Sequence, residues 1–175
     1  MNEQPLVRLI DDDEIFLMSQ KLLLETRGFS VETYSSAKAF LENDQLSRPG
    51  CAVADIRMPG LTGLEMQTIL ESRRSTLPLI FLTGHGDVSM AVHTMRHGAA
   101  DFLEKPVKPD VLIAVVTKAV EASVKAWQAG REKAHVEALY AELTPREREV
   151  VARAALDTPN LAKALARCIL TVGSP

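Results

Sequence analysis

A single aspartate at the end of a short apolar run constrains the fold of this chain more than any other feature. Residues 51–54 are small and apolar, Asp55 follows them, and the turn-forming pair Pro59-Gly60 comes soon after. Such a run is typical of a strand that is buried on both faces, as in a parallel sheet covered by helices. Asp55 would then lie at the carboxyl end of its strand, where open α/β sheets bind their ligands.

The composition is that of an ordinary globular protein. The 175 residues are 46% hydrophobic and 25% charged, which is enough for one well-buried core and a smaller appendage. The longest strongly apolar runs, such as residues 111–116, are too short to cross a membrane, and residues 1–5 lack a signal-peptide pattern. The two cysteines, Cys51 and Cys168, lack a metal-ligand spacing, and Cys51 is interpreted as a small core residue. We therefore expect a cytoplasmic protein without membrane association.

The charge distribution gives no sign of a nucleic-acid-binding surface. The net charge is −3, with the negative excess in residues 1–120 and almost balanced charges in residues 121–175. Neither part has the strongly basic character that DNA-binding domains need.

Apolar periodicity predicts five strands that alternate with helices. The strands are expected over residues 6–10, 29–34, 51–55, 78–83 and 101–103. This alternation specifies a doubly wound α/β fold with a parallel sheet and right-handed crossovers. The intervening helices are expected to have apolar faces made by Ile15, Met18 and Leu22, then by Met66, Ile69 and Leu70, and then by Val88, Ala91, Val92 and Met95.

The predicted strands end in residues that can act together. The triplet Asp11-Asp12-Asp13 follows the first strand, Asp55 ends the third, Thr83 ends the fourth and Lys105-Pro106 follows the fifth. Parallel strands share one carboxyl edge, so these groups are expected to converge. Crowded carboxylates resist joint ionisation unless a cation holds them, and an all-oxygen site of this kind suits Mg²⁺. With a lysine and a hydroxyl nearby, the set suits phosphoryl transfer to Asp55 as the nucleophile.

Four segments together resemble the receiver domain of bacterial two-component response regulators, and the resemblance covers residues 5–120. The segments are Ile10-Asp11-Asp12, Asp55-Ile56-Arg57-Met58-Pro59-Gly60, Thr83-Gly84-His85-Gly86-Asp87 and Asp101-Phe102-Leu103-Glu104-Lys105-Pro106. Each is weak alone, but the four in this order and spacing are specific. The loop at 84–87, with the helix after it, is similar to the FixJ branch of the FixJ/NarL-type regulators.

The resemblance implies a flavodoxin-like sheet with the strand order 2-1-3-4-5 and a metal-dependent phosphoacceptor. Asp55 would accept the phosphoryl group from a sensor histidine kinase. Mg²⁺ would be held by Asp11, Asp12, Asp55 and the backbone carbonyl of Arg57. The protein would then be a phosphoacceptor that catalyses only its own phosphorylation and dephosphorylation, and not an enzyme in the usual sense.

The resemblance also implies a switch. Thr83 and Lys105 would contact the phosphoryl group, and the bond between Lys105 and Pro106 would be cis. Thr83 would move inward and Phe102 would follow it, since phosphorylation adds charge and acceptor oxygens. The face made by the fourth helix, fifth strand and fifth helix would change, and a phosphorylation-dependent homodimer would form there.

Several side chains near these motifs have simpler interpretations. Asp13 is better interpreted as an N-cap than as a ligand, although the acidic triplet leaves the ligand register open by one residue. His93 and His97 have the i, i+4 spacing of a metal pair, but without a third ligand a solvated helix face or dimer surface is favoured. His85 belongs to the loop near Thr83, and a role in dephosphorylation has no support from the sequence.

After Lys105-Pro106 the sequence predicts one long helix, from Pro109 to about Leu143. Residues 1–120 would form the receiver domain and 121–142 a linker helix, which could be partly frayed or form a coiled-coil dimer seam. On its sheet side the helix is expected to bury Val111, Leu112, Val115 and Ala119.

Residues 143–175 resemble an incomplete LuxR-type helix-turn-helix region. Thr144 is expected to cap a helix, with Pro145 at its first position and Glu147 completing a capping box. The segment 157–160 resembles the turn before the second helix of that family. Only 15 residues follow Asn160, too few for a complete recognition helix, so we expect no sequence-specific DNA binding by this chain. A truncated chain, a frame-shifted product and a naturally shortened regulator all remain open.

Other functional classes fit the residues less well. A haloacid-dehalogenase-type phosphatase needs a second acid two residues after the nucleophile, where Arg57 stands. A flavodoxin-type carrier needs a phosphate loop after the first strand, where the acidic triplet would repel the phosphate. The serious alternative is a receiver that acts by protein contact, or as a phosphate sink, without binding DNA.

Overall fold

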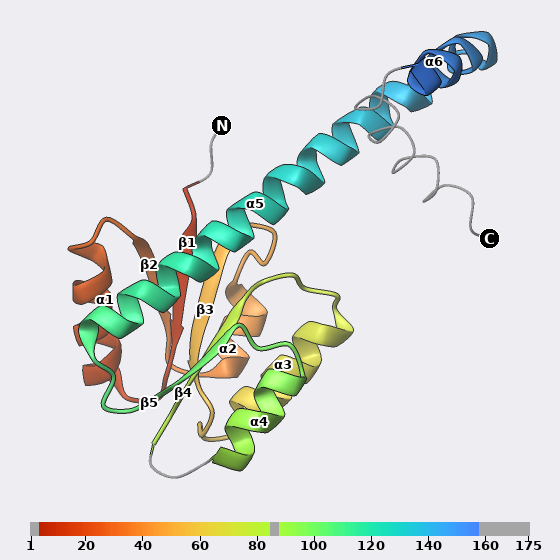
Figure 1. Cartoon of the computed structure of the whole chain (residues 1–175). Helices are drawn as coiled ribbons and strands as arrows, with labels where there is room; N and C mark the ends of the chain where they lie inside the picture. Colours follow the sequence, from red (N-terminus) through yellow and green to blue (C-terminus); the bar gives the residue numbers. More distant parts are fainter. Residues whose placement is uncertain (1–3, 85–87, 158–175) are drawn as a thin grey trace. The chain divides into compact units, whose positions relative to one another are not determined.

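The computed structural model describes residues 4–84 and 88–157 (Figure 1). Five strands alternate with five helices, and a sixth helix follows. The elements are β1 (Leu6–Ile10), α1 (Glu14–Glu25), β2 (Ser30–Tyr34), α2 (Ala37–Asn43), β3 (Gly50–Asp55), α3 (Gly63–Ser72), β4 (Leu79–Thr83), α4 (Val88–Arg96), β5 (Asp101–Glu104), α5 (Pro109–Glu142) and α6 (Pro145–Asp157).

The five strands form one parallel sheet in the order β2-β1-β3-β4-β5. This confirms the predicted fold class, the flavodoxin-like strand order and the long helix after β5. The register aligns Ile10 with Ala54 and Asp55 with Leu82, so β1, β3 and β4 end at the same edge. The sheet therefore brings the residues that follow these strands together.

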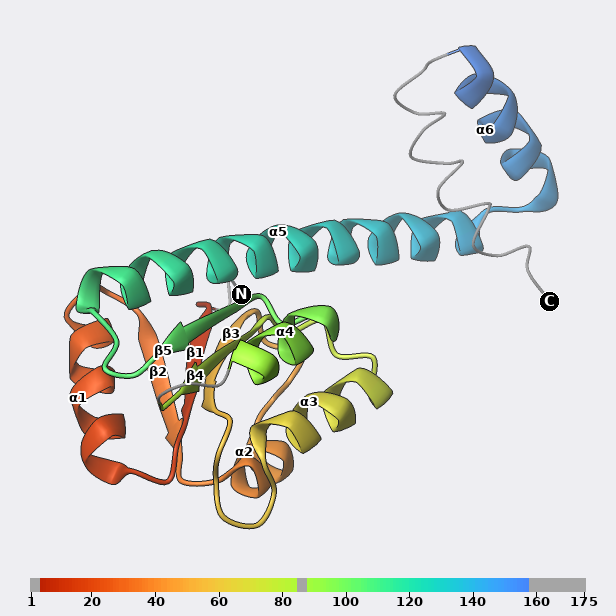
Figure 2. The ribbon, with the colours of Figure 1, turned by 60° about the horizontal axis from the view of Figure 1, so that its bottom comes forward.

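Alternate residues of β3 supply the two halves of the core. Cys51 and Val53 belong to the apolar cluster under α1 and the first turns of α5, whereas Ala52 and Ala54 belong to the cluster under α2 and α3. The ribbon shows the same arrangement, with α1 and α5 over one face of the sheet and α2, α3 and α4 over the other (Figures 1 and 2). Burial on both faces explains why β3 is apolar throughout.

The apolar face predicted for the first helix, α1, faces solvent and does not meet the sheet. Ile15, Met18 and Leu22 are 81%, 74% and 64% exposed, whereas Leu17 and Leu24 are buried against the sheet. The helix carries apolar residues on both sides, and the periodicity alone does not say which side meets the sheet.

Two further helices bury different residues from those expected. In α4, Val92 and Met95 are about half exposed, Ala91 is half-buried and Thr94 is buried, while the side chain of Val88 lies outside the described ones. In α5, Val111 is exposed, whereas Leu112 and Ala119 are buried as predicted. On α3, Met66 and Leu70 are buried as predicted, and Ile69 is half-buried.

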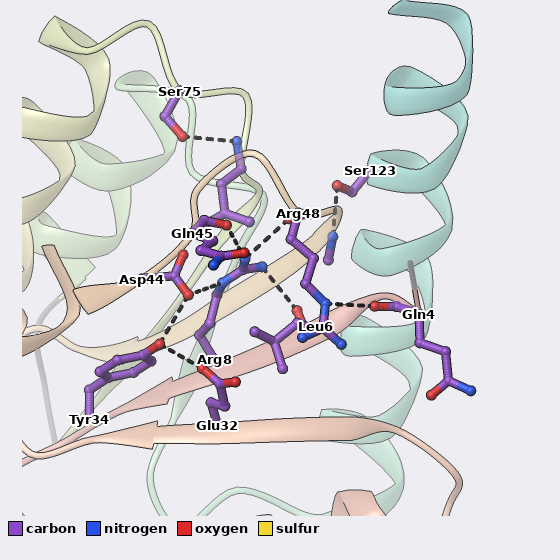
Figure 3. Close-up of polar contacts among 12 residues, drawn as sticks. Gln4, Leu6, Arg8, Glu32, Tyr34, Asp44, Gln45, Arg48, Ser75 and Ser123 are labelled. Atoms are coloured by element: carbon purple, nitrogen blue, oxygen red, sulfur yellow. Dashed lines mark hydrogen bonds and ion pairs between the residues drawn. The ribbon is translucent and has the colours of Figure 1, made fainter. Parts of the chain in front are cut away.

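Arg8, the one charged residue of β1, is fully buried and joins β1 to the connection between α2 and β3 (Figure 3). Its Nε donates to Asp44 Oδ1 at 2.8 Å. Its terminal nitrogens donate to the carbonyl oxygens of Leu6, Gln45 and Arg48 at 3.2, 2.9 and 3.1 Å. This side chain therefore ties the loop between α2 and β3 to the first strand.

The chain divides into two compact units, Met1–Lys125 and Ala126–Pro175. In the second unit, α6 begins with the predicted capping box: the Thr144 amide donates to Glu147 Oε2 at 2.8 Å, and the Glu147 amide donates to the Thr144 hydroxyl oxygen at 3.4 Å. The turn expected over 157–160 lies largely outside the described residues. Among the helices that the structure describes, none combines the length and apolar character needed to span a membrane.

Candidate functional site

Three carboxylates meet at the carboxyl edge of the sheet, just beyond β1 and at the end of β3. One oxygen from each of Asp11, Asp12 and Asp55 lies within 4.8 Å of the others. Asp11 is buried, Asp55 is half-buried and Asp12 is exposed, so the cluster opens to solvent on one side. Three carboxylate oxygens with room for water fit the preference of Mg²⁺ for oxygen ligands and retained waters.

Lys105, in the segment after β5, reaches across the sheet edge to two of these carboxylates. Its Nζ lies 2.6 Å from Asp11 Oδ2 and 2.7 Å from Asp55 Oδ2. Burial lowers the pKa of Lys105, but the hydrogen bonds and negative charges of Asp11 and Asp55 outweigh it and raise that pKa above its usual range. The lysine is therefore a fixed positive charge between the two acids.

Asp11 is held by several groups at once. Its Oδ1 accepts the amide of Asp13 at 3.0 Å, and its own amide donates to the carbonyl oxygen of Tyr34 at 3.1 Å. Burial raises the pKa of Asp11, and the contacts to Lys105 and Asp13 oppose this rise. A metal ion bound at this edge, in addition to Lys105, would further favour the charged form of the Asp11 carboxylate.

Asp13 caps α1, as predicted, and takes no part in the acidic cluster. Its Oδ1 accepts the amides of Ile15 and Phe16, both at 3.0 Å. The cap starts α1 directly beside the cluster and brings the Phe16 ring over Lys105, with Nζ 4.4 Å from the ring centroid. The sequence analysis missed Phe16, because the contact joins an aromatic residue of α1 to a lysine 89 positions later.

The loop after β3 orients Asp55. The amide of Arg57 donates to Asp55 Oδ1 at 3.0 Å, and the amide of Gly63 donates to the carbonyl oxygen of Ile56 at 3.0 Å. A Cβ on Gly63 would lie 2.5 Å from the Asp55 carbonyl oxygen, so only glycine allows α3 to start this close to β3. This steric requirement depends on the distance between α3 and β3 in the fold and has no signal in the sequence around Gly63.

Thr83 and Lys105 are neighbours through the backbone. The amide of Lys105 donates to the Thr83 carbonyl oxygen at 2.7 Å, and the Lys105–Pro106 peptide bond is cis, as the resemblance implied. The Thr83 side chain is buried, and its hydroxyl donates to the carbonyl oxygen of Gly84 at 3.0 Å. Phe102 on β5 is half-buried against the core on the α3 side.

The remaining candidates lie away from this edge or outside the described residues. His93 and His97 on α4 have ring centroids 4.4 Å apart, and among the described residues they belong to no cluster with a third metal-binding side chain. His85 lies outside the described residues. Cys51 is buried in the core, as predicted, and burial raises its pKa to about 12, so its thiol stays protonated.

The chain belongs to the response regulator receiver domain family, whose sequence profile matches residues 7–117. Within that family it is similar to regulators of the FixJ type. It is 39% identical to the transcriptional regulatory protein FixJ of Bradyrhizobium diazoefficiens over 145 residues, which are 83% of this chain and 71% of that protein. It is 33% identical to the response regulator protein TodT of Pseudomonas putida over 83% of this chain and 64% of that protein.

Solved structures of response regulators also resemble this chain. The response regulator StyR superposes with a TM-score of 0.81 at 33% identity, over 93% of this chain and 83% of that one. The structure named FixJ-N gives a TM-score of 0.64 at 40% identity, over 67% of this chain and 94% of that one. The family and the fold implied by the sequence motifs are therefore confirmed.

Proposed function

We propose that this protein is a response regulator whose Asp55 accepts a phosphoryl group from a sensor histidine kinase in the presence of Mg²⁺. The observation that carries the proposal is the position of Lys105 Nζ, which bridges Asp11 and Asp55 at 2.6 and 2.7 Å beside an open group of three carboxylates. A fixed cation, a half-buried nucleophile at the open side of the cluster and an oxygen-rich metal site are the parts that phosphoryl transfer needs.

Each residue has a defined part in the transfer. An oxygen of Asp55 forms a bond to phosphorus, the bond from phosphorus to the donor's imidazole nitrogen breaks, and the electron pair leaves with that nitrogen. Asp11, Asp12, Asp55 and the Arg57 carbonyl would hold Mg²⁺, which neutralises charge on the phosphoryl oxygens when bound. Lys105 stabilises the same charge from the side of β5.

The output would pass through the face made by α4, β5 and α5. Thr83 ends β4, next to the site, and its hydroxyl would turn from the Gly84 carbonyl to a phosphoryl oxygen, with Phe102 moving into the space released. Val92 and Met95 of α4 are each 47% exposed, and this apolar surface suits a homodimer contact. The names of the FixJ relatives support control of transcription as the final output.

The test combines phosphorylation with a measurement of mass in solution. The chain is incubated with acetyl phosphate and Mg²⁺, the modified residue is located by peptide mass spectrometry, and light scattering gives the mass before and after. We expect modification at Asp55 and conversion from monomer to dimer. Modification elsewhere, or none, would contradict the proposed phosphoacceptor.

The same experiment separates the proposed output from its alternatives. A dimer under every condition would assign assembly to the helix that extends beyond Lys125, and phosphorylation would then act on an existing dimer. A phosphorylated chain that stays monomeric would contradict the dimer proposal and favour action by protein contact or as a phosphate sink.

Asp12→Ala is expected to weaken Mg²⁺ binding. Loss of an outer-shell partner typically lowers metal affinity 10- to 100-fold, so loss of a direct ligand should weaken binding by about tenfold or more. Asp12 is exposed, which keeps the cost to folding small. Isothermal titration with MgCl₂ measures the affinity, with Asp13→Ala as the matched control; unchanged affinity in Asp12→Ala would transfer the ligand role away from Asp12.

The exposed apolar stripe of α1, made by Ile15, Met18 and Leu22, is the proposed contact for the kinase. Its first residue, Ile15, follows Asp12 of the acidic cluster by three positions, so a helical partner on the stripe could bring a phosphohistidine to Asp55. Met18→Glu is expected to slow transfer from a phosphorylated kinase about tenfold or more while leaving phosphorylation by acetyl phosphate unchanged. Leu139→Glu, an exposed apolar residue of the other unit, is the control; equal rates in both variants and wild type would contradict the contact.

A further inference from the structure

The aromatic ring of Phe16 occupies a side of the Lys105 ammonium group that the carboxylates leave open. An ammonium group has three N–H donors, and two carboxylates accept from this one, Asp11 at 2.6 Å and Asp55 at 2.7 Å. The Phe16 ring centroid lies 4.4 Å from Nζ. A cation within about 6 Å of a ring centroid is attracted by the negative face of the ring.

The position of the ring is fixed independently of the lysine. The amide of Phe16 donates to Asp13 Oδ1 at 3.0 Å in the cap of α1, so the backbone of Phe16 is anchored at the first turn. The half-buried Phe16 side chain packs against the core cluster under α1 and α5. The ring is thus a rigid surface that belongs to the core and faces the site.

We propose that Phe16 is a positioning residue for phosphoryl transfer, acting through Lys105. This inference rests on the proposed function of Asp55 as phosphoacceptor. The two carboxylate contacts of Lys105 must change in the reaction, because Asp55 becomes bonded to phosphorus and Asp11 is a proposed metal ligand. The contact with the Phe16 ring depends on neither event. It keeps Nζ at the sheet edge, where Nζ can meet the incoming phosphoryl oxygens without a search among lysine rotamers.

The ring also limits the hydration of the lysine. The Lys105 side chain is only 22% exposed, and the ring covers Nζ on a side that water would otherwise reach. Replacing water by a fixed aromatic face strengthens the interaction of the ammonium group with the charge on the transferring phosphoryl oxygens. Removal of the aromatic face should therefore slow phosphorylation without removing any group that takes part in the chemistry.

The test compares side chains of nearly equal size but different charge distribution at position 16. Phe16→Leu keeps an apolar side chain without an aromatic face, and pentafluorophenylalanine at position 16 keeps the shape but reverses the charge on the face. Initial rates are measured with acetyl phosphate at saturating Mg²⁺. We expect both changes to slow phosphorylation roughly two- to fivefold, the effect of a partly exposed cation–π contact, and Phe16→Trp to retain the wild-type rate.

Phe29→Leu is the matched control, because Phe29 is a half-buried aromatic residue packed on the same core cluster. Urea unfolding should show similar losses for Phe29→Leu and Phe16→Leu, but only Phe16→Leu should be slowed. A wild-type rate with pentafluorophenylalanine, or equal slowing in Phe29→Leu, would overturn the inference and leave the proposed function intact. A wild-type chain that takes up no phosphoryl group would overturn the proposed function and this inference with it.

Discussion

Asp55→Asn is expected to take up no phosphoryl group from acetyl phosphate or from a kinase. The substitution replaces a charged nucleophile by a neutral amide of nearly the same shape. The amide oxygen can still accept from Lys105 Nζ or from the Arg57 amide, which lie 2.7 and 3.0 Å from the two carboxylate oxygens. One weakened hydrogen bond costs only about 1 kcal/mol, so the variant should remain folded. Mass spectrometry of the intact chain measures the result.

In the Asp55→Asn variant, neither Asp11 nor Asp12 should become the phosphoacceptor. Asp11 is 1% exposed, and its oxygens accept from Lys105 and from the Asp13 amide, so an incoming phosphorus atom cannot reach it. Asp12 is exposed but lies outside the direct reach of Lys105, which bonds the other two. Asp12→Asn, the matched control, should still be phosphorylated when Mg²⁺ is raised. A phosphoryl group mapped to Asp11 or Asp12 in the Asp55→Asn chain would contradict the assignment.

The fold and the main features of the site could be predicted because they depend on local patterns and one topological rule. Short apolar runs ending in polar residues define the strands, and parallel strands place their carboxyl ends at one edge. That rule alone is sufficient to bring Asp11, Asp55 and Lys105 together, although Lys105 lies 94 and 50 positions from the two acids. The N-cap of α1 at Asp13 and the capping box of α6 were also predictable, since a cap is a contact between residues three apart.

The missed features depend on contacts that no periodicity encodes. The exposed stripe of α1 could not be told from its core face, because Met18 and Leu17 are equally apolar and only the sheet decides which is buried. The Phe16 ring contacts Lys105 only because the fold brings α1 next to the segment after β5. No residue near Phe16 in the sequence indicates this contact. In the sequence, Arg8 is a single charged residue within an apolar strand. Its acceptors lie 36 to 40 residues later, in the connection between α2 and β3.

Arg8→Met is expected to destabilise the receiver unit by about 3–5 kcal/mol, the cost of leaving one member of a buried ion pair without its partner. Arg8 and Asp44 have side chains that are 0% and 1% exposed, so water cannot replace the lost contact (Figure 3). Asp44 would keep only the Tyr34 hydroxyl, which donates to Oδ1 at 3.0 Å, while its Oδ2 already lacks a hydrogen-bond partner. The carbonyl oxygen of Arg48 would also lose the Arg8 donor, and that of Gln45 would keep only the Arg48 amide, at 3.0 Å.

Urea unfolding followed by circular dichroism measures this loss, and a double variant shows its origin. Adding Asp44→Leu to Arg8→Met removes the buried Asp44 carboxylate that has lost its ion-pair partner. The double variant should therefore recover part of the lost stability. Recovery should be incomplete, because the backbone carbonyls that accept from Arg8 lose those hydrogen bonds in both variants. Lys21→Met is the control: its ion pair with Glu25, at 3.8 Å, is exposed, and its loss should change stability by no more than about 0.5 kcal/mol. If Arg8→Met costs no more than Lys21→Met, Arg8 does not hold the α2–β3 connection, and other contacts, such as that from Arg48 Nε to the Gln4 carbonyl oxygen at 2.8 Å, must hold that loop.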